Sequence, residues 1–317
     1  MTTFGYALSS EEHRPAELVR YAGRAEELGY EFVAVSDHYH PWIDGQGESP
    51  FVWTVLGGIA QATERIRVGT GVTCPTVRIH PAIIAQAAAT TAAMMPGRFF
   101  LGVGSGEALN EHILGDRWPP ADVRLQMLEE AVAVIRLLWQ GGEQSHQGRH
   151  YLVENARLYT LPDAPPPIVV AAGGTKAAEL AGRAGDGFWN TSPEAGPIET
   201  FRQAGGDGKP RYGQITVCWA KDEQQARKTA LELWPNAAIS GQLSQDLSTP
   251  THFEQAAQMA DEDRIAQRVV CGPDPGKHLD MIRTYIEAGY DHVYFHQVGP
   301  DQEGFFRFYA DEVLPKV

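Results

Sequence analysis

The stretch Phe99–Asn110, FFLGVGSGEALN, indicates the fold class. Its first six residues form an unbroken apolar run of the kind found in parallel strands covered on both faces, and a glycine-rich turn follows. Similar short runs occur along the whole chain, at Thr3–Leu8, Phe32–Ser36, Arg67–Gly71, Ile168–Ala172, Gly187–Trp189, Gly213–Trp219 and His292–His296. Helical patterns separate most of these runs, so the sequence predicts an α/β protein built on parallel strands.

Helical periodicity is clearest in Asp122–Trp139, where apolar residues recur every three or four positions from Leu125 to Leu138. About eight strand–helix units in 317 residues match a (β/α)8 TIM barrel with insertions, with a doubly wound open sheet as the alternative. Val269–Cys271 is also strand-like. We take His292–His296 as the eighth strand, because the helix predicted at Gln302–Val313 then closes the chain.

Residues 1–317 are expected to form a single domain, with insertions near 105–121, 140–165 and 235–268. The proline-rich segment Pro162–Pro167 follows a predicted hairpin, Glu143–Gly148 with Tyr151–Glu154. Since it leads directly into the strand at Ile168, it is interpreted as a rigid connection and not as a domain linker.

The charge balance and composition exclude several classes of function. With 26 Lys and Arg against 40 Asp and Glu, the net charge of −14 argues against nucleic acid as a partner. No run approaches the roughly 20 apolar residues of a membrane helix, and the N-terminus lacks a secretory signal pattern. We therefore expect a cytoplasmic protein, with Cys74, Cys218 and Cys271 as reduced thiols.

In a barrel of this type the active site lies at the carboxyl ends of the strands. Polar residues and glycines follow several of the predicted strands there, in the segments Ser36–Trp42, Gly71–Thr76, Gly104–Glu111, Ala171–Thr175 and His296–Gln297. These segments are the candidate site.

Histidine and glutamate are suited to proton transfer near neutral pH, and His38 and Glu107 follow two different strands. Gly173 and Gly174 open a predicted helix whose amides are able to hold an anion. The Gly-x-Gly-x-Gly run at 102–106 matches neither the dinucleotide fingerprint nor the P-loop. His38 and His40 also raise a zinc hydrolase as an alternative, but the remaining ligands lack a motif, so no metal is predicted.

Four segments carry a resemblance to a known family: Ser36–Trp42, Thr73–Thr76, Leu101–Glu111 and Ala181–Gly187. Together they resemble the luciferase-like family of coenzyme F420-dependent oxidoreductases, most closely the branch of the F420-dependent glucose-6-phosphate dehydrogenase. The resemblance extends over essentially the whole chain. It implies a (β/α)8 barrel with insertions, a homodimer, and a deazaflavin coenzyme bound at the carboxyl ends of the strands.

The resemblance also implies roles for individual residues. His38 is expected to remove the proton of the substrate hydroxyl, Glu107 to supply a proton to the deazaflavin, Trp42 to stabilise the intermediate, and Glu11 to be a substrate-side carboxylate. Residues expected to contact the coenzyme are Asp37, Gly71, Val72, Gly106, Glu107, Asn110, Ala171, Ala172, Gly173, Gly174 and Thr191. The Gly71–Val72 peptide bond is expected to be cis, as in the family.

The substrate region departs from the sugar-phosphate members of the branch, which hold the phosphate with two lysines and an arginine. The corresponding positions here are Glu194, Ser244 and Arg268. A carboxylate repels a phosphate dianion, so the sequence favours a small uncharged substrate over glucose 6-phosphate. Gln242, Gln245 and His252 of the last insertion are further candidates. The alternatives are an FMN-dependent luciferase-like monooxygenase and a catalytically idle deazaflavin-binding protein.

Overall fold

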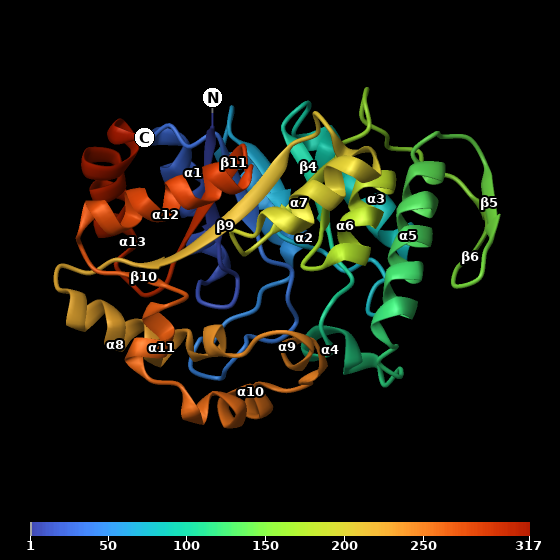
Figure 1. Ribbon diagram of the computed structural model, residues 1–317. Helices are drawn as coiled ribbons and strands as arrows, with labels where there is room; N and C mark the ends of the chain where they lie inside the picture. The colour runs from blue at the N-terminus through green and yellow to red at the C-terminus, as the bar shows by residue number, and fades with distance from the viewer. Residues whose placement is uncertain (1) are drawn as a thin grey trace.

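The computed structural model describes residues 2–317, and a closed barrel of parallel strands lies at its centre (Figure 1). The barrel strands are β1 (Thr3–Leu8), β2 (Phe32–Val35), β3 (Arg67–Thr70), β4 (Phe99–Val103), β7 (Ile168–Ala171), β8 (Gly187–Asn190), β9 (Arg211–Cys218) and β11 (His292–Gln297). Each strand pairs in parallel with its neighbours, and β11 pairs with both β1 and β9, which closes the ring. The predicted (β/α)8 barrel is confirmed, and the open sheet is excluded.

The ninth strand of the sheet, β10 (Val270–Cys271), lies outside the barrel. It pairs only with the end of β9, with Cys271 opposite Cys218. His292–Gln297 is therefore the eighth barrel strand, as expected. The predicted closing helix is α13 (Gln302–Phe308), which continues as a wider π-helical turn over Tyr309–Val313.

Helices surround the barrel, and each begins and ends where the sequence permits. The longest, α5, begins directly after Pro119-Pro120 and buries Leu128, Val132 and Ile135, which lie on one face. The bounds of helices α1 to α12 are α1 (Pro15–Glu27), α2 (Val52–Ala62), α3 (Pro81–Met94), α4 (Ala108–Glu111), α5 (Ala121–Leu138), α6 (Thr175–Ala184), α7 (Ala195–Phe201), α8 (Glu223–Leu233), α9 (Gln242–Asp246), α10 (Pro250–Ala256), α11 (Glu262–Ala266) and α12 (Pro275–Ala288).

The core has two layers. The larger layer lies between the strands and the helices, and the smaller one fills the barrel with aromatic side chains, among them Phe32, Phe100, Trp189, Tyr212 and Tyr294. Tyr212 stacks on Trp189 with ring centres 5.2 Å apart. The barrel interior is thus packed below its carboxyl end, and a ligand has to bind above this aromatic layer.

Two insertions leave the barrel outline. One is the predicted hairpin, now β5 (Gln144–Gln147) and β6 (Leu152–Ala156), which projects beyond α5 (Figure 1). The other, residues 235–268, forms a layer with α9, α10 and α11 below the barrel in that view, facing the carboxyl ends of the strands. The last insertion, which carries the candidates Gln242, Gln245 and His252, therefore covers the barrel mouth.

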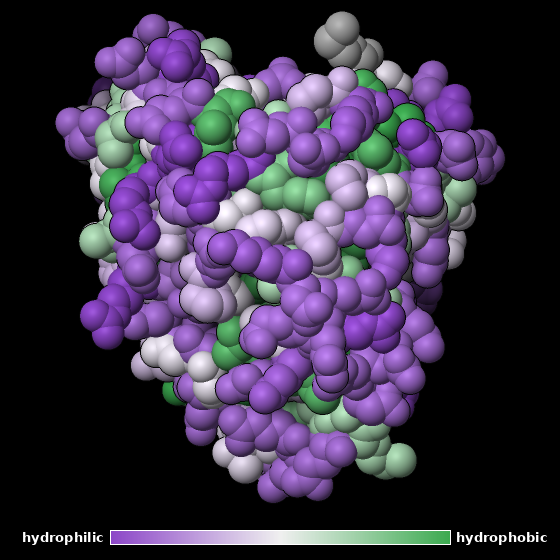
Figure 2. Space-filling view, turned by 90° about the vertical axis from the view of Figure 1, so that its left-hand side faces the viewer, coloured by the Kyte–Doolittle hydropathy of each residue, from purple (hydrophilic) through white to green (hydrophobic). Residues whose placement is uncertain are grey.

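The outer surface is largely polar. Figure 2 shows the face that carries α8, α12 and α13, on which hydrophilic residues dominate and apolar residues form small separate patches. Within residues 2–317, none of the helices combines the length and the apolar character needed to span a membrane.

Candidate active site

The most closely connected group at the barrel mouth surrounds Glu11 and His38. Glu11 lies in the loop after β1, and its Oε2 accepts hydrogen bonds from Ser36 Oγ at 2.6 Å and Ser9 Oγ at 3.0 Å. Its Oε1 lies 3.4 Å from Nδ1 of His38, in the loop after β2. Because β1 and β2 are neighbours in the barrel, the two loops meet, and both side chains are largely buried.

The contacts of His38 determine which ring nitrogen faces the mouth. Nδ1 lies 3.1 Å from the carbonyl oxygen of His40 and near the Glu11 carboxylate, so Nδ1 carries the hydrogen. Nε2 is then the nitrogen available to accept a proton. Trp42 packs edge-on against the imidazole, with ring centres 4.9 Å apart.

Glu11 is held in its charged form. Burial raises the pKa of this carboxyl group, but the nearby His38 and the hydrogen bond from Ser36 outweigh burial, and the net pKa is lowered. The carboxylate therefore fixes His38 and stabilises a positive charge on its imidazole, which is the arrangement that a histidine base requires.

A second group joins the ends of β2, β3 and β4 through Arg78. This side chain donates from Nη2 to Asp37 Oδ1 at 2.9 Å, and its Nε lies 3.4 Å from Glu111 Oε1. Asp37 Oδ2 also accepts from Thr73 Oγ1 at 2.7 Å. Arg78, Asp37 and Glu111 are almost completely buried, so one guanidinium group serves two carboxyl groups.

Arg78 was not among the residues that the sequence singled out. Its position in the sequence could have indicated a role at the site, because Arg78 is the one Lys or Arg residue between Arg67 and Arg98 and lies in the loop after the third strand. Burial raises the pKa of Glu111 to about 7 and outweighs the hydrogen bond from the Arg78 backbone amide and the charge of the Arg78 guanidinium group, and the nearby Asp37 and Glu107 raise the pKa further. Glu111 is therefore partly protonated near neutral pH.

The glycine turn after β4 holds Glu107 and Asn110 at the mouth. Gly106 has a φ of +77°, and a Cβ atom there would lie 2.5 Å from Cys74 Sγ, so only glycine fits. Asn110 Oδ1 accepts from the backbone amides of Tyr39 and His40, at 2.8 and 3.2 Å. The Nδ2 atom of Asn110 is buried and has no hydrogen-bond partner among residues 2–317. The side chain of Glu107 is partly exposed.

The remaining expected coenzyme contacts lie after β3, β7 and β8. The Gly71–Val72 peptide bond is cis, as expected. Gly173 and Gly174 are exposed at the start of α6, and a Cβ atom at either would meet no atom within 4 Å. Thr191 is exposed, and the neighbouring Asn190 has a buried Nδ2 with no partner in the described chain. Ala171 is the last residue of β7, and Ala172 connects it to Gly173.

The 235–268 insertion is anchored on the Trp42 loop. Phe253 of α10 packs against Trp42 with ring centres 5.1 Å apart, and the backbone amide of Asp44 donates to Glu254 Oε1 at 3.0 Å. Directly before the insertion, the carbonyl of Leu233 at the end of α8 accepts from Gln46 Nε2 at 2.9 Å. The insertion therefore supplies an apolar wall beside Trp42.

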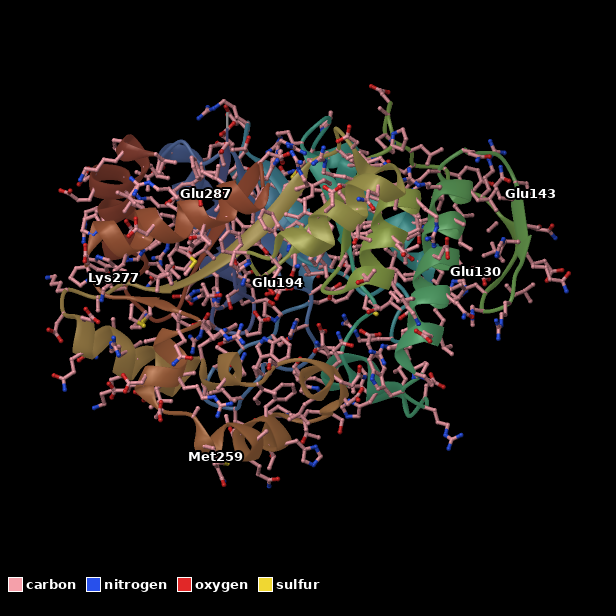
Figure 3. All side chains as sticks on the ribbon, viewed as in Figure 1. Glu130, Glu143, Glu194, Met259, Lys277 and Glu287 are labelled. Carbon is pink, nitrogen blue, oxygen red and sulfur yellow. The ribbon has the colours of Figure 1, made fainter. Side chains whose placement is uncertain are left out.

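No hydrogen bond or ion pair within residues 2–317 joins the expected substrate residues Glu194, Ser244 and Arg268 to one another. Glu194 directly precedes α7, and its side chain is exposed. In Figure 3 it lies near the centre, above the layer formed by the insertion, whereas Met259 lies on the outer side of that layer. Ser244 Oγ donates to the Gly241 carbonyl, and Arg268 is exposed.

The three polar candidates of the insertion have separate surroundings. Gln245 Oε1 accepts from the buried Arg124 at 2.6 Å. Gln242 pairs with Asp246 on the surface, and His252 is exposed. Only Gln245 is thus tied to the barrel side of the mouth.

His38 and His40 turn to different partners. Nδ1 of His40 lies 2.8 Å from the carbonyl oxygen of Leu109, away from Glu11. Within the part of the chain that the structure describes, no three His, Cys, Asp or Glu side chains are grouped so as to hold a metal ion.

Comparisons with known proteins place the chain in a family. The model of the luciferase-like monooxygenase family matches residues 1–292. F420-dependent glucose-6-phosphate dehydrogenases from Microbacterium testaceum and Beutenbergia cavernae are 37% and 36% identical, covering 99% and 100% of this chain and 97% and 98% of theirs. A solved F420-dependent secondary alcohol dehydrogenase, in complex with an F420–acetone adduct, aligns over 98% of both chains with a TM-score of 0.92 and 29% identity. The chain therefore belongs to the luciferase-like monooxygenase family.

Proposed function

We propose that the protein is a coenzyme F420-dependent oxidoreductase that transfers a hydride between the deazaflavin and a small organic substrate. The observation that carries the proposal is the buried His38–Glu11 pair, which places a proton acceptor at the barrel mouth. The similarity over nearly the full length to F420-dependent dehydrogenases supports the coenzyme assignment.

The residues at the mouth fit such a coenzyme. The buried Nδ2 atoms of Asn110 and Asn190 lack partners in the described chain, and each is a donor that a polar ligand can satisfy. The exposed backbone at Gly173 and Gly174 begins a ten-residue helix, whose first amides suit a phosphodiester. We assign the coenzyme to the surface between these groups.

The residues that we expect to contact the coenzyme are compatible with this placement. Gly71 and Val72 would contact the ring of the coenzyme, and Asp37, which accepts hydrogen bonds from Thr73 and Arg78, would contact it as well. Further contacts are assigned to Gly106, Glu107, Asn110, Ala171, Ala172, Gly173, Gly174 and Thr191. When bound, coenzyme F420 supplies a two-electron hydride carrier with no direct oxygen chemistry.

The chain itself handles the protons. Nε2 of His38 accepts the proton of the substrate hydroxyl, and the adjacent Glu11 carboxylate stabilises the resulting imidazolium. Trp42, packed between His38 and Phe253, limits access of water to the imidazole. Glu107, on the turn after β4, is the residue to which we assign the delivery of a proton to the bound coenzyme.

The substrate is a small uncharged alcohol or polyol, or the corresponding carbonyl or another reducible C=C or C=N group, and not glucose 6-phosphate. Glu194 is a carboxylate at the mouth, where it repels a phosphate dianion. The insertion wall beside Trp42 is formed by apolar side chains, including Ile239 and Leu247. Homodimer formation remains a prediction from the resemblance, and a cytoplasmic location remains a prediction from the sequence composition.

Coenzyme titration and turnover test the proposal. We expect coenzyme F420 to bind with quenching of its fluorescence, and turnover of small secondary alcohols but not of glucose 6-phosphate. His38→Ala is expected to bind the coenzyme and lose at least 100-fold in kcat, whereas His146→Ala, in the β5–β6 hairpin outside the barrel, keeps both. Tight binding of FMN without binding of F420 would refute the proposal in favour of the monooxygenase. F420 binding without turnover, unaffected by His38→Ala, would indicate an idle coenzyme-binding protein.

A further inference from the structure

A second histidine–glutamate pair lies beside the first at the barrel mouth. His296 Nε2 lies 2.7 Å from Glu12 Oε2, and both side chains are at least 95% buried. Glu12 Oε1 also accepts from the backbone amide of Gly299 at 3.3 Å. The mechanism proposed above uses neither residue.

The topology explains why the two pairs are neighbours. Strand β1 lies between β2 and β11, so the loop after β1 touches the loops on both sides. Glu11 turns toward His38 at the end of β2, and Glu12 turns toward His296 at the end of β11. Two consecutive carboxylates therefore hold two imidazoles at one mouth.

His296 lies on the inner face of its strand. Side chains along a strand alternate between two faces, and Tyr294, two residues earlier, packs inside the barrel against Trp189. Phe295 packs on the opposite side, against Tyr309. His296 is therefore one layer above Tyr294 on the inner face, at the level of the mouth.

The Glu12 contact fixes the tautomer of His296. A carboxylate accepts the hydrogen of Nε2, so Nδ1 of the neutral ring carries a lone pair. This Nδ1 is buried and has no partner among residues 2–317. Buried polar atoms nearly always have partners, so a partner from outside the chain is indicated.

We propose that Nδ1 of His296 accepts a hydrogen bond from a second hydroxyl group of the substrate, so that the enzyme prefers diols or polyols to simple alcohols. The inference rests on the function proposed above and deepens it. Trp234, at the base of the 235–268 insertion, packs edge-on against the imidazole with ring centres 4.3 Å apart. The bound hydroxyl would lie beside this indole, out of bulk water, while the reacting hydroxyl faces His38.

His296→Gln separates ligand binding from the structural contact. The glutamine amide reaches the position of Nε2 and still donates to Glu12, but it has no acceptor at the position of Nδ1. His296→Asn places an acceptor near Nδ1 and gives up the contact with Glu12. The probes are propan-2-ol and propane-1,2-diol, which share the same secondary carbinol and differ by one hydroxyl.

In the F420-loaded wild type we expect kcat/KM for the diol to exceed that for propan-2-ol by about tenfold. His296→Gln is expected to abolish this preference with little change for propan-2-ol, and His296→Asn to retain part of it. Equal losses for both alcohols in His296→Gln, or an unchanged preference, would overturn the inference.

A measurement without turnover keeps the inference separate from the proposed function. In the coenzyme-free protein, long-range ¹H–¹⁵N spectra of the imidazoles are compared with those of His296→Gln, which assigns the His296 signals. We expect the Nε2–H tautomer, and an Nδ1 shift on titration with propane-1,2-diol but not with propan-2-ol. The opposite tautomer, or no diol-specific shift, would refute the role of His296 even if F420-dependent turnover is observed. Failure to bind F420 together with a diol-specific shift would refute the proposed function alone.

Discussion

Glu111 provides a test of the buried charge network by the pH dependence of stability. The perturbation is Glu111→Gln, which replaces a carboxyl group that is 1% exposed by a permanently neutral group of the same shape. The glutamine oxygen still accepts the hydrogen bond from the backbone amide of Arg78, now 2.7 Å from Glu111 Oε2. The main change is therefore the loss of a titrating group.

The magnitude follows from the pKa of Glu111, which burial raises from the usual 4.5 to about 7. Between these pH values the folded protein keeps a proton that the unfolded chain has released. The stabilisation is therefore fully present below pH 4.5 and is lost as the pH rises through 7. At about 1.4 kcal/mol for each unit of pKa, the total is roughly 3 kcal/mol, of which about 2.5 kcal/mol is lost between pH 5 and pH 8.

Urea unfolding at pH 5 and pH 8 measures this loss. We expect the wild type to lose about 2.5 kcal/mol more than Glu111→Gln between the two pH values. Glu232→Gln, at an exposed glutamate on α8, serves as the control and should follow the wild type. If Glu111→Gln shows the same pH dependence as the wild type, the carboxyl group does not hold its proton near neutral pH, and the reasoning fails.

Two further substitutions test the packing of the mouth by urea unfolding. Gly106→Ala should destabilise the protein by about 1–3 kcal/mol more than Gly47→Ala, because both glycines have positive φ but only Gly106 lies against the Cys74 sulfur; equal losses would contradict the close contact. Arg78→Met should lower the free energy of unfolding by about 3–5 kcal/mol, since it removes the guanidinium group that faces two buried carboxyl groups. Arg202→Met, which breaks exposed ion pairs, is expected to have no measurable effect, and a similar result for both arginines would argue against the network.

The sequence predicted the barrel because each strand is a short apolar run buried on both faces, and the runs alone locate the strands to within about two residues. It did not distinguish β10 from a barrel strand, because a run of three apolar residues carries no information about its partner. The pairing of Val270 and Cys271 with the outer end of β9 depends on where the 235–268 insertion places them.

For the candidate site, the sequence predicted the location but not the partners of the site residues. The rule that barrel sites lie at the carboxyl ends of strands pointed to His38, Glu107 and the segment that ends at His296. The partners of these residues were not predictable, since they depend on contacts between distant parts of the chain. Glu12 lies 284 positions from His296, and Arg78 is 41 and 33 positions from Asp37 and Glu111.

The order of strands around the barrel connects these contacts into one arrangement. Strand β1 lies between β2 and β11, so the short loop after β1 contacts the loops on both sides of it. Moving this loop by one residue would leave a carboxylate beside only one of the two histidines, because Glu11 and Glu12 are consecutive and are flanked by Ser10 and His13. Arg78 similarly connects the ends of the neighbouring strands β2, β3 and β4, through its ion pairs with Asp37 and Glu111. The contacts of the charged groups at the mouth therefore depend on the register of the barrel, and not on any one side chain alone.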